Sequence, residues 1–351
     1  MIVHVFIYEK FAEDYIQRIN RLFDSTDHLF FVYGRKALEN IKTIHGDNVF
    51  FSSNFNNIFS WGSFLSKKID KANKVIIHSI FSRKLLFILL LKQKKNASKY
   101  FWMIWGGDLY NAYWNKDKNL MNKILELARK KFIRKIPAVG YIRGDFEFLT
   151  THYKTNAKFY TASYTYDFHI PFTSPKTASS INILLANSAS PSCRYEAMLK
   201  KIAKFKCPNI QIYCVLSYPN NQTYISYIKK LGHDLLGDRF HALDYYMPYN
   251  EYMKLLNSID IALFNHNRQQ ALGNIASLLY LGKKVYISDE NACKEYFEDM
   301  GAIVYAINDF SELSLSAPIN ENIVIKNRKA IEHFFSDAEF YARWEKIFSS
   351  Q

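Results

Sequence analysis

The stretch "IDIALFNHNRQQALGNIASLLYLGKKVYIS", residues 259–288, contains the repeating unit that decides the fold. It opens with an apolar run at 259–265, passes through a polar segment into a helical pattern, and closes with a second apolar run at 284–288. Near-continuous apolar strands separated by helices are typical of a parallel sheet that is covered on both faces. The stretch therefore predicts a strand, a helix and a second strand of such a sheet.

The same alternation continues through both halves of the chain. In the first half, strands are expected at 2–8, 28–34, 48–53, 74–82, 100–107 and 138–142. In the second half, strands are expected at 181–187, 210–217, 239–244, 259–265 and 284–288. Amphipathic helical patterns fill most of the segments between them. One of these, at 120–135, places four apolar residues on one helical face: Leu120, Ile124, Leu127 and Phe132.

These patterns predict two doubly wound α/β domains that face each other, each with a mainly parallel sheet. The N-terminal domain is expected over 1–170 and the C-terminal domain over 171–335, with a last helix at 336–351. The segment 167–180 has two prolines and no strong period, and it is predicted to be the linker.

The charge is distributed unevenly between the two predicted domains. Residues 1–170 hold 27 Lys and Arg against 14 Asp and Glu, a net charge of +13, whereas residues 171–351 hold 19 against 18, a net charge of +1. An excess of this kind in one domain indicates that the domain meets something anionic. Nucleic acid, anionic lipid and a phosphorylated substrate are the candidates.

The longest apolar run is "LLFILLL" at 85–91, and it is too short to span a bilayer, which takes about 20 residues. Basic residues flank it, beginning with Arg83 and Lys84. No secretory signal is recognised at the N-terminus. We therefore expect a protein that is soluble or at most attached to a membrane surface. A buried helix with lysine ends is the alternative explanation of the run.

The helix inside the opening stretch is predicted to form an anion site. Gly273 is expected to turn the backbone, Asn274 to cap the helix and Gly282 to end it. The amides of residues 275–277 would then lack partners within the helix and point outward, and the helix dipole would favour a negative charge there.

Side chains next to this helix are suited to a nucleotide diphosphate. Arg268 offers a forked cation, and Gln269 and Gln270 offer hydrogen bonds to phosphate or sugar hydroxyls. The alternative is an ordinary capped helix beside a solvated arginine. Two further polar turns are expected at the same sheet edge, after the strands at 181–187 and 210–217. Their candidate donor-binding residues are Asn187, Ser188, Ser217, Tyr218 and Asn221.

Several segments resemble one family of bacterial glycosyltransferases. They are "WGGDLY" (105–110), "NSASPSCRYEAM" (187–198), "SYPNNQTYISY" (217–227) and "MPYNEYMKLLNSIDIALFNHNRQQALGN" (247–274). They are similar to the transferases that add 4-acetamido-4,6-dideoxygalactose (Fuc4NAc) from its dTDP-sugar to an undecaprenyl-diphosphate disaccharide, glycosyltransferase family 56. The family reads RQQGIGT where this chain has RQQALGN. Ala271 and Asn274 therefore depart from the pattern, which leaves the donor sugar open.

The resemblance implies a GT-B fold of two facing Rossmann-like domains, in which the C-terminal domain binds the nucleotide-sugar donor and the N-terminal domain binds a lipid-linked glycan acceptor. It implies an inverting transfer without a metal ion, and no cofactor is expected. It also implies a protein attached peripherally to the anionic surface of the inner membrane, at its cytoplasmic face. The sequence itself contains no DxD pair. Around the acceptor, the candidate residues are Arg83, Lys84, Trp105 and Tyr110.

Inverting transfer needs a base that takes the proton from the attacking hydroxyl. Asp108 follows a predicted strand and two glycines, and His78 lies late in another strand, so both are candidates. The alternative interpretations are a turn-forming aspartate and a core histidine.

Two other functions are compatible with the sequence. One is a GT-B transferase that acts on a soluble or polymeric glycan. The other is a basic nucleic-acid-binding protein, although no nucleic-acid-binding motif is present.

Overall fold

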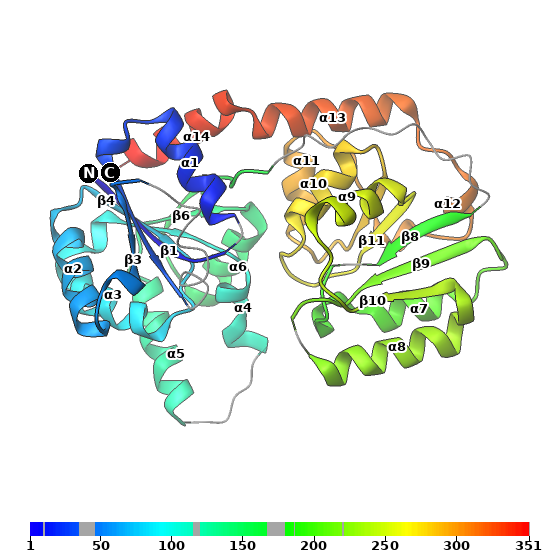
Figure 1. The fold of residues 1–351 in the computed structure, drawn as a ribbon, viewed down its shortest axis with the longest axis horizontal. Coiled ribbons are helices and arrows are strands. Elements are labelled where there is room, and N and C mark those ends of the chain that lie inside the picture. Colours follow the sequence, from blue (N-terminus) through cyan, green and yellow to red (C-terminus); the bar gives the residue numbers. More distant parts are fainter. Residues whose placement is uncertain are drawn as a thin grey trace. The chain divides into compact units, whose positions relative to one another are not determined.

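The computed structural model describes residues 1–9, 11–34, 46–114, 120–166, 180–185, 187–219 and 221–350. Within this range the chain forms two compact units, residues 1–166 with 335–351 and residues 167–334. Nearly all of the predicted linker, residues 167–179, lies outside the described residues. Figure 1 shows that each unit is built on its own sheet with helices packed around it.

The first unit contains a parallel sheet of seven strands in the order β3-β2-β1-β4-β5-β6-β7. Its strands are β1 (Ile2–Ile7), β2 (His28–Tyr33), β3 (Val49–Phe51), β4 (Lys74–His78), β5 (Tyr100–Met103), β6 (Ala138–Tyr141) and β7 (Lys158–Thr161). Its helices are α1 (Ala12–Leu22), α2 (Ile58–Lys71), α3 (Arg83–Asn96), α4 (Gly107–Trp114), α5 (Leu120–Ile133), α6 (Arg143–Tyr153) and α14 (Asp337–Ser349).

The second unit contains a parallel sheet of six strands in the order β10-β9-β8-β11-β12-β13. Its strands are β8 (Ile181–Leu185), β9 (Ile210–Val215), β10 (Phe240–Leu243), β11 (Ile261–Phe264), β12 (Lys284–Ile287) and β13 (Tyr305–Ala306). Its helices are α7 (Tyr195–Ile202), α8 (Gln222–Leu236), α9 (Tyr249–Ser258), α10 (Leu272–Tyr280), α11 (Cys293–Asp299), α12 (Leu313–Ser316) and α13 (Glu321–Phe335).

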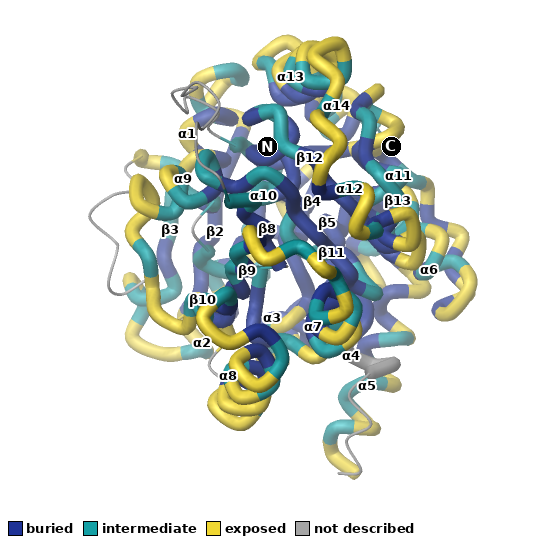
Figure 2. The backbone as a smooth tube through the Cα atoms, turned by 90° about the vertical axis from the view of Figure 1, so that its right-hand side faces the viewer, coloured by how far each residue is buried: buried dark blue, intermediate teal, exposed yellow. Residues whose placement is uncertain are grey.

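All strands predicted from the sequence are present, and both sheets are parallel as expected. The strands of both sheets are largely buried (Figure 2), as the continuous apolar runs require. In the first unit, Val3 and Val5 face the core that α2 and α3 cover. The alternate residues His4 and Phe6 face Tyr15 of α1 instead. Two edge strands, β7 and β13, were not predicted.

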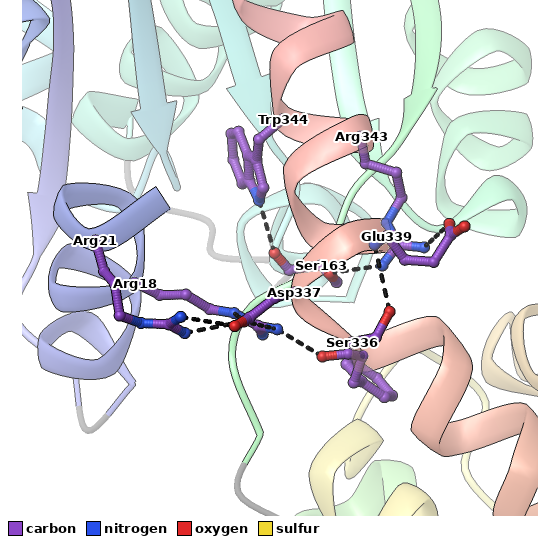
Figure 3. A network of polar contacts seen from close by, with 9 residues as sticks. Arg18, Arg21, Ser163, Ser336, Asp337, Glu339, Arg343 and Trp344 are labelled. Atoms are coloured by element: carbon purple, nitrogen blue, oxygen red, sulfur yellow. Dashed lines mark hydrogen bonds and ion pairs between the residues drawn. The ribbon is translucent and has the colours of Figure 1, made fainter. Parts of the chain in front are cut away.

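The C-terminal helix α14 packs on the first unit. Arg18 donates to Asp337 at 2.9 Å and Arg21 donates to it at 2.6 and 2.9 Å (Figure 3). The indole of Trp344 is fully buried and donates to the carbonyl of Ser163 at 3.1 Å. The chain therefore returns to its first unit after completing the second, and α14 closes one face of the first sheet.

Candidate functional site

The strand order of the second sheet identifies the place where a ligand would bind. Starting from β8, the chain first adds β9 and β10 on one side and then β11, β12 and β13 on the other. In open parallel sheets, ligands bind beyond the carboxyl ends of the strands at the point where this reversal occurs. Here that point lies between β8 and β11, so the loops that follow these two strands form the candidate donor site.

Helix α10 begins three residues earlier than predicted. Ala271 takes the cap position in a left-handed conformation, with φ 64° and ψ 18°, and the helix starts at Leu272. Gly273 and Asn274 are therefore the second and third helical residues, and the predicted turn at Gly273 and cap at Asn274 are wrong. The predicted end is confirmed, because Gly282 follows the last turn with φ 75° and donates to the carbonyl of Leu279 at 3.1 Å.

Because the helix starts earlier than predicted, its unpaired amides belong to earlier residues. The amide of Ile275 donates to the carbonyl of Ala271 at 2.9 Å, so it does not point outward as predicted. The amides of residues 272–274 have no partner among the described residues. A helix leaves its first amides unpaired, and its dipole favours an anion beside them. The unpaired amides thus lie three residues nearer the N-terminus than predicted, and anion binding by them stays a prediction.

A buried histidine and an arginine lie next to this helix start. His266 is fully buried, and burial, with the positive charge of Arg268 nearby, lowers its pKa to about 3. The imidazole is therefore neutral at physiological pH. Arg268 is half-buried and donates to the carbonyl of Gln269 at 3.3 Å. Arg268 precedes the unpaired amides by four residues in the chain, and its guanidinium carries a charge of the kind that a diphosphate needs.

Buried polar atoms without partners gather in the loops after β8, β11 and β12. Within the described part of the chain, they are Asn187 Oδ1, both ring nitrogens of His266, Asn267 Oδ1, Gln269 Oε1 and Asn291 Nδ2. Buried polar groups are normally hydrogen-bonded, and each exception needs an explanation. A bound ligand with hydroxyl and amide groups would satisfy them. His266, Asn267 and Asn291 were missed from the sequence, although each follows a predicted strand end.

Other predicted donor-site residues have structural partners. Gln270 donates to Ser192 Oγ at 2.8 Å, which ties the loop after β11 to the loop after β8. The Ser188 hydroxyl lies 3.3 Å from Cys193 Sγ. These contacts stiffen the edge of the sheet.

The turn after β9 contributes a helix cap and two exposed residues. Asn221 caps α8 by accepting from the amide of Tyr224 at 3.2 Å. Ser217 is exposed, and Tyr218 is 70% exposed while its carbonyl accepts from the amide of Ala189 at 2.6 Å. Donor binding by these residues stays a prediction.

Asp108 holds together a loop at the carboxyl edge of the first sheet. Its side chain is fully buried and accepts hydrogen bonds from the amide of Ile80 at 3.0 Å, from Trp102 Nε1 at 2.9 Å and from the amide of Trp105 at 2.9 Å. Burial raises the pKa of the carboxyl, while Arg129 and these hydrogen bonds oppose the rise. As a catalytic base, Asp108 would first have to be exposed to the substrate, so that role stays a prediction.

His78 belongs to a chain of buried side chains. Trp105 Nε1 donates to the hydroxyl of Tyr164 at 2.7 Å, and this hydroxyl lies 2.7 Å from His78 Nδ1. His78 Nε2 lies 3.3 Å from His4 Nδ1, and His4 Nε2 lies 3.0 Å from His28 Nδ1. The strand register brings the three histidines together. His4 pairs with Phe30, and His78 pairs with Phe6. The rings of His28, His4 and His78 therefore lie on one face of β2, β1 and β4.

Burial keeps these histidines neutral. It lowers the pKa of His78 and of His4 well below the usual value, and His28 and His78 lower that of His4 further. Burial also lowers the pKa of His28 to about 4. The structure therefore places His78 inside the unit as a core histidine, bonded to side chains, and base catalysis by His78 is untested.

The residues predicted around the acceptor separate into two groups. Arg83 and Lys84 are exposed at the start of α3, and Arg83 donates to Asn122 Oδ1 at 2.7 Å. Trp105 is half-buried at the carboxyl edge. Tyr110, in contrast, is packed in the core and donates to Asp145 Oδ1 at 2.7 Å, so it has no surface to offer an acceptor. Among the described residues, no three His, Cys, Asp or Glu side chains form a group that could hold a metal ion.

Several solved structures are similar to this chain over nearly its whole length. HepE from Anabaena, solved in complex with UDP and glucose, is 11% identical with a TM-score of 0.70, and the match covers 100% of each chain. A glycosyltransferase from Rickettsia africae ESF-5 is 14% identical with a TM-score of 0.69, over 99% of this chain and 97% of the other. WaaG, a glycosyltransferase of lipopolysaccharide biosynthesis, is 11% identical with a TM-score of 0.59, over 100% of each chain.

The two parallel-sheet Rossmann-type units and these structural neighbours define the GT-B fold. The chain belongs to the family described as 4-alpha-L-fucosyltransferase, glycosyl transferase group 56, whose model matches residues 33–351. The resemblance seen in the sequence is thereby confirmed. It also gives a reason for the family's glycine at position 271, because the chain adopts a left-handed conformation there.

Proposed function

We propose that this glycosyltransferase takes a deoxyamino sugar such as Fuc4NAc, or a related sugar, from a nucleotide-diphosphate donor. The acceptor is a glycan linked to a polyprenyl diphosphate at the cytoplasmic face of the inner membrane. The transfer inverts the anomeric centre and requires no metal ion. The observation that carries the donor half of the proposal is the group of unpaired amides and buried polar atoms at the switch point of the second sheet.

The diphosphate is placed at the start of α10. There the amides of residues 272–274 donate hydrogen bonds, and Arg268 adds a full positive charge. Donors that are fixed before the reaction stabilise the charge that develops on a leaving diphosphate. This arrangement supplies the electrostatic stabilisation that a metal ion supplies in other transferases.

The sugar and nucleoside hydroxyls are placed against the buried acceptors. Asn187, Asn267 and Gln269 each present an unpartnered side-chain oxygen, which accepts from hydroxyl groups. The neutral His266 offers one donor and one acceptor. A set with more acceptors than donors suits a ligand with many hydroxyls better than one with many carbonyls.

The acceptor half of the proposal is supported by charge and exposed side chains in the first unit. Residues 1–170 carry a net charge of +13, from 27 basic and 14 acidic residues, which suits a lipid diphosphate. Arg83, Lys84 and Trp105 are available at or near the carboxyl edge of the first sheet. A soluble or polymeric glycan would use the same donor site and remains the alternative acceptor.

A donor panel tests the proposal. We expect dTDP-sugars or UDP-sugars to raise the melting temperature of the protein, and we expect transfer to a polyprenyl-diphosphate glycan in the presence of excess EDTA. Proton NMR of the product reports whether the anomeric centre is inverted. No stabilisation by any nucleotide sugar, despite an intact fold, would contradict the donor assignment. Transfer that stops with EDTA would contradict metal independence alone.

A further inference from the structure

The apolar face of α5 points away from its own domain. Leu120, Ile124 and Leu127 follow one another at helical spacing, and they are 72%, 52% and 67% exposed. The buried residues of the helix, Arg129, Phe132 and Ile133, all lie near its C-terminal end. Figures 1 and 2 both show the first turns of α5 extending beyond the rest of the unit. Of the four residues predicted to share a helical face, only Phe132 is buried.

Helix α3 lies beside α5 and also carries exposed apolar residues. Arg83 donates to Asn122 at 2.7 Å near the start of both helices, and Gln93 donates to the carbonyl of Phe132 at 2.7 Å near their ends. The two helices therefore run side by side in the same direction. On the outer side of α3, Phe87 is 62% exposed and Leu91 is 68% exposed.

Together these residues form an apolar surface of the first unit. We call it the α3–α5 face, and it consists of Phe87, Leu91, Leu120, Ile124 and Leu127. Large clustered apolar patches on a protein surface mark an interaction site. Phe81, two residues before α3, is 47% exposed, and its ring centroid lies 6.5 Å from that of Trp105 in the candidate acceptor region.

Basic side chains surround the α3–α5 face. Helix α3 has five basic residues and no acidic residue, while α5 has four basic residues and one acidic residue, Glu126. Glu126 is half-buried and lies 3.8 Å from Arg129, so it adds no exposed negative charge to the rim. The exposed members of this rim are Arg83, Lys84, Lys94, Lys95, Lys123 and Lys131.

We propose that the α3–α5 face docks on an anionic lipid bilayer, with its apolar residues in the interface and its basic rim on the lipid headgroups. The choice of a bilayer rests on the proposed function, because a polyprenyl-linked acceptor lies in one. Apolar residues framed by lysines and arginines are the composition of a surface that lies in a membrane interface. A second copy of the chain would bring the same positive rim against this one, which disfavours pairing. No helix among the described residues is long and apolar enough to cross the bilayer, so this docking is peripheral.

Vesicle co-sedimentation tests the proposal without donor or acceptor. We expect the protein to bind vesicles of phosphatidylglycerol and phosphatidylcholine, and to bind vesicles of phosphatidylcholine alone much more weakly. Binding to the anionic vesicles should weaken as salt is added. The double variant Ile124→Glu/Leu127→Glu should lose roughly 100-fold in partition coefficient, because it removes two apolar anchors and adds two repelled charges.

A matched control is available in the second unit. Leu313 of α12 is 81% exposed and lies outside the α3–α5 face, so Leu313→Glu should bind vesicles like the wild type. Both variants change exposed residues, and unaltered melting temperatures would confirm that they are folded. Equal vesicle binding by the double variant and the wild type would overturn the proposal. So would a wild type that ignores vesicles and forms dimers that the double variant does not form, as measured by light scattering.

Nucleotide-sugar binding, measured on the same proteins, separates this proposal from the proposed function. The double variant should retain wild-type affinity for the donor, since both positions lie in the first unit on α5. Vesicle binding without any donor binding would support the docking surface and contradict the donor assignment. Donor binding without vesicle binding would support the donor assignment and contradict the docking surface.

Discussion

Lowering the pH should destabilise the first unit through its chain of buried histidines. His4, His28 and His78 are all held neutral in the fold, and burial lowers the pKa of each. In the unfolded chain a histidine has a pKa of about 6.5, so below that pH the unfolded state binds more protons than the folded state. The unfolding free energy must therefore fall as the pH falls below about 6.5, until the pH reaches the lowered pKa of each ring, which is about 4 for His28.

The size of the effect follows from the three rings. Each histidine that stays neutral in the fold lowers the unfolding free energy by about 1.4 kcal/mol when the pH falls from 7.5 to 5.5. Three such histidines together lower it by about 4 kcal/mol, which is a large part of the stability of an ordinary domain. Asp337 does not contribute to the change, because its arginine partners lower its pKa to about 2 and it stays charged across this range.

Urea unfolding followed by tryptophan fluorescence measures this for the first unit. All five tryptophans belong to that unit: Trp61, Trp102, Trp105, Trp114 and Trp344. The variant His28→Gln should show about two-thirds of the wild-type loss of stability between pH 7.5 and 5.5. An unfolding free energy that is constant or higher at pH 5.5 would refute the account of three buried neutral rings.

Two substitutions test the loops at the candidate site. Asp108→Asn places an amide NH2 group among three N–H donors, so it should lower the unfolding free energy by about 3 kcal/mol in the same fluorescence assay. An intact stability with lost turnover would instead point to Asp108 as the base. Ala271→Gly should raise the melting temperature by a few degrees, since glycine adopts φ 64° without strain and the gain is about 0.5–1 kcal/mol. A lower melting temperature would show that Ala271 is not strained.

The sequence predicts the strands and the fold class because buried parallel strands are apolar throughout. The two missed strands, β7 and β13, lie at sheet edges, where β7 is partly exposed and β13 has two residues. At such edges the apolar signal is weak.

The start of α10 was misplaced because glycine and asparagine are common at helix ends, whereas alanine rarely adopts a left-handed conformation. The exposure of the apolar face of α5 could not be predicted, for a different reason. Helical spacing shows that Leu120, Ile124 and Leu127 share a face, but it does not show what that face meets. The chain of histidines depends on strand register, and a single sequence gives no register between strands that are distant along the chain.

The central claim is that the start of α10 and Arg268 bind the diphosphate of the donor. Isothermal titration of UDP and dTDP into the wild type and into Arg268→Ala tests it most directly, with Lys326→Ala on the exposed side of α13 as a control for total charge. We expect Arg268→Ala to weaken diphosphate binding by roughly 10-fold to 100-fold, the value of one charge-assisted hydrogen bond, with Lys326→Ala unchanged. Equal affinities in all three proteins would contradict the claim.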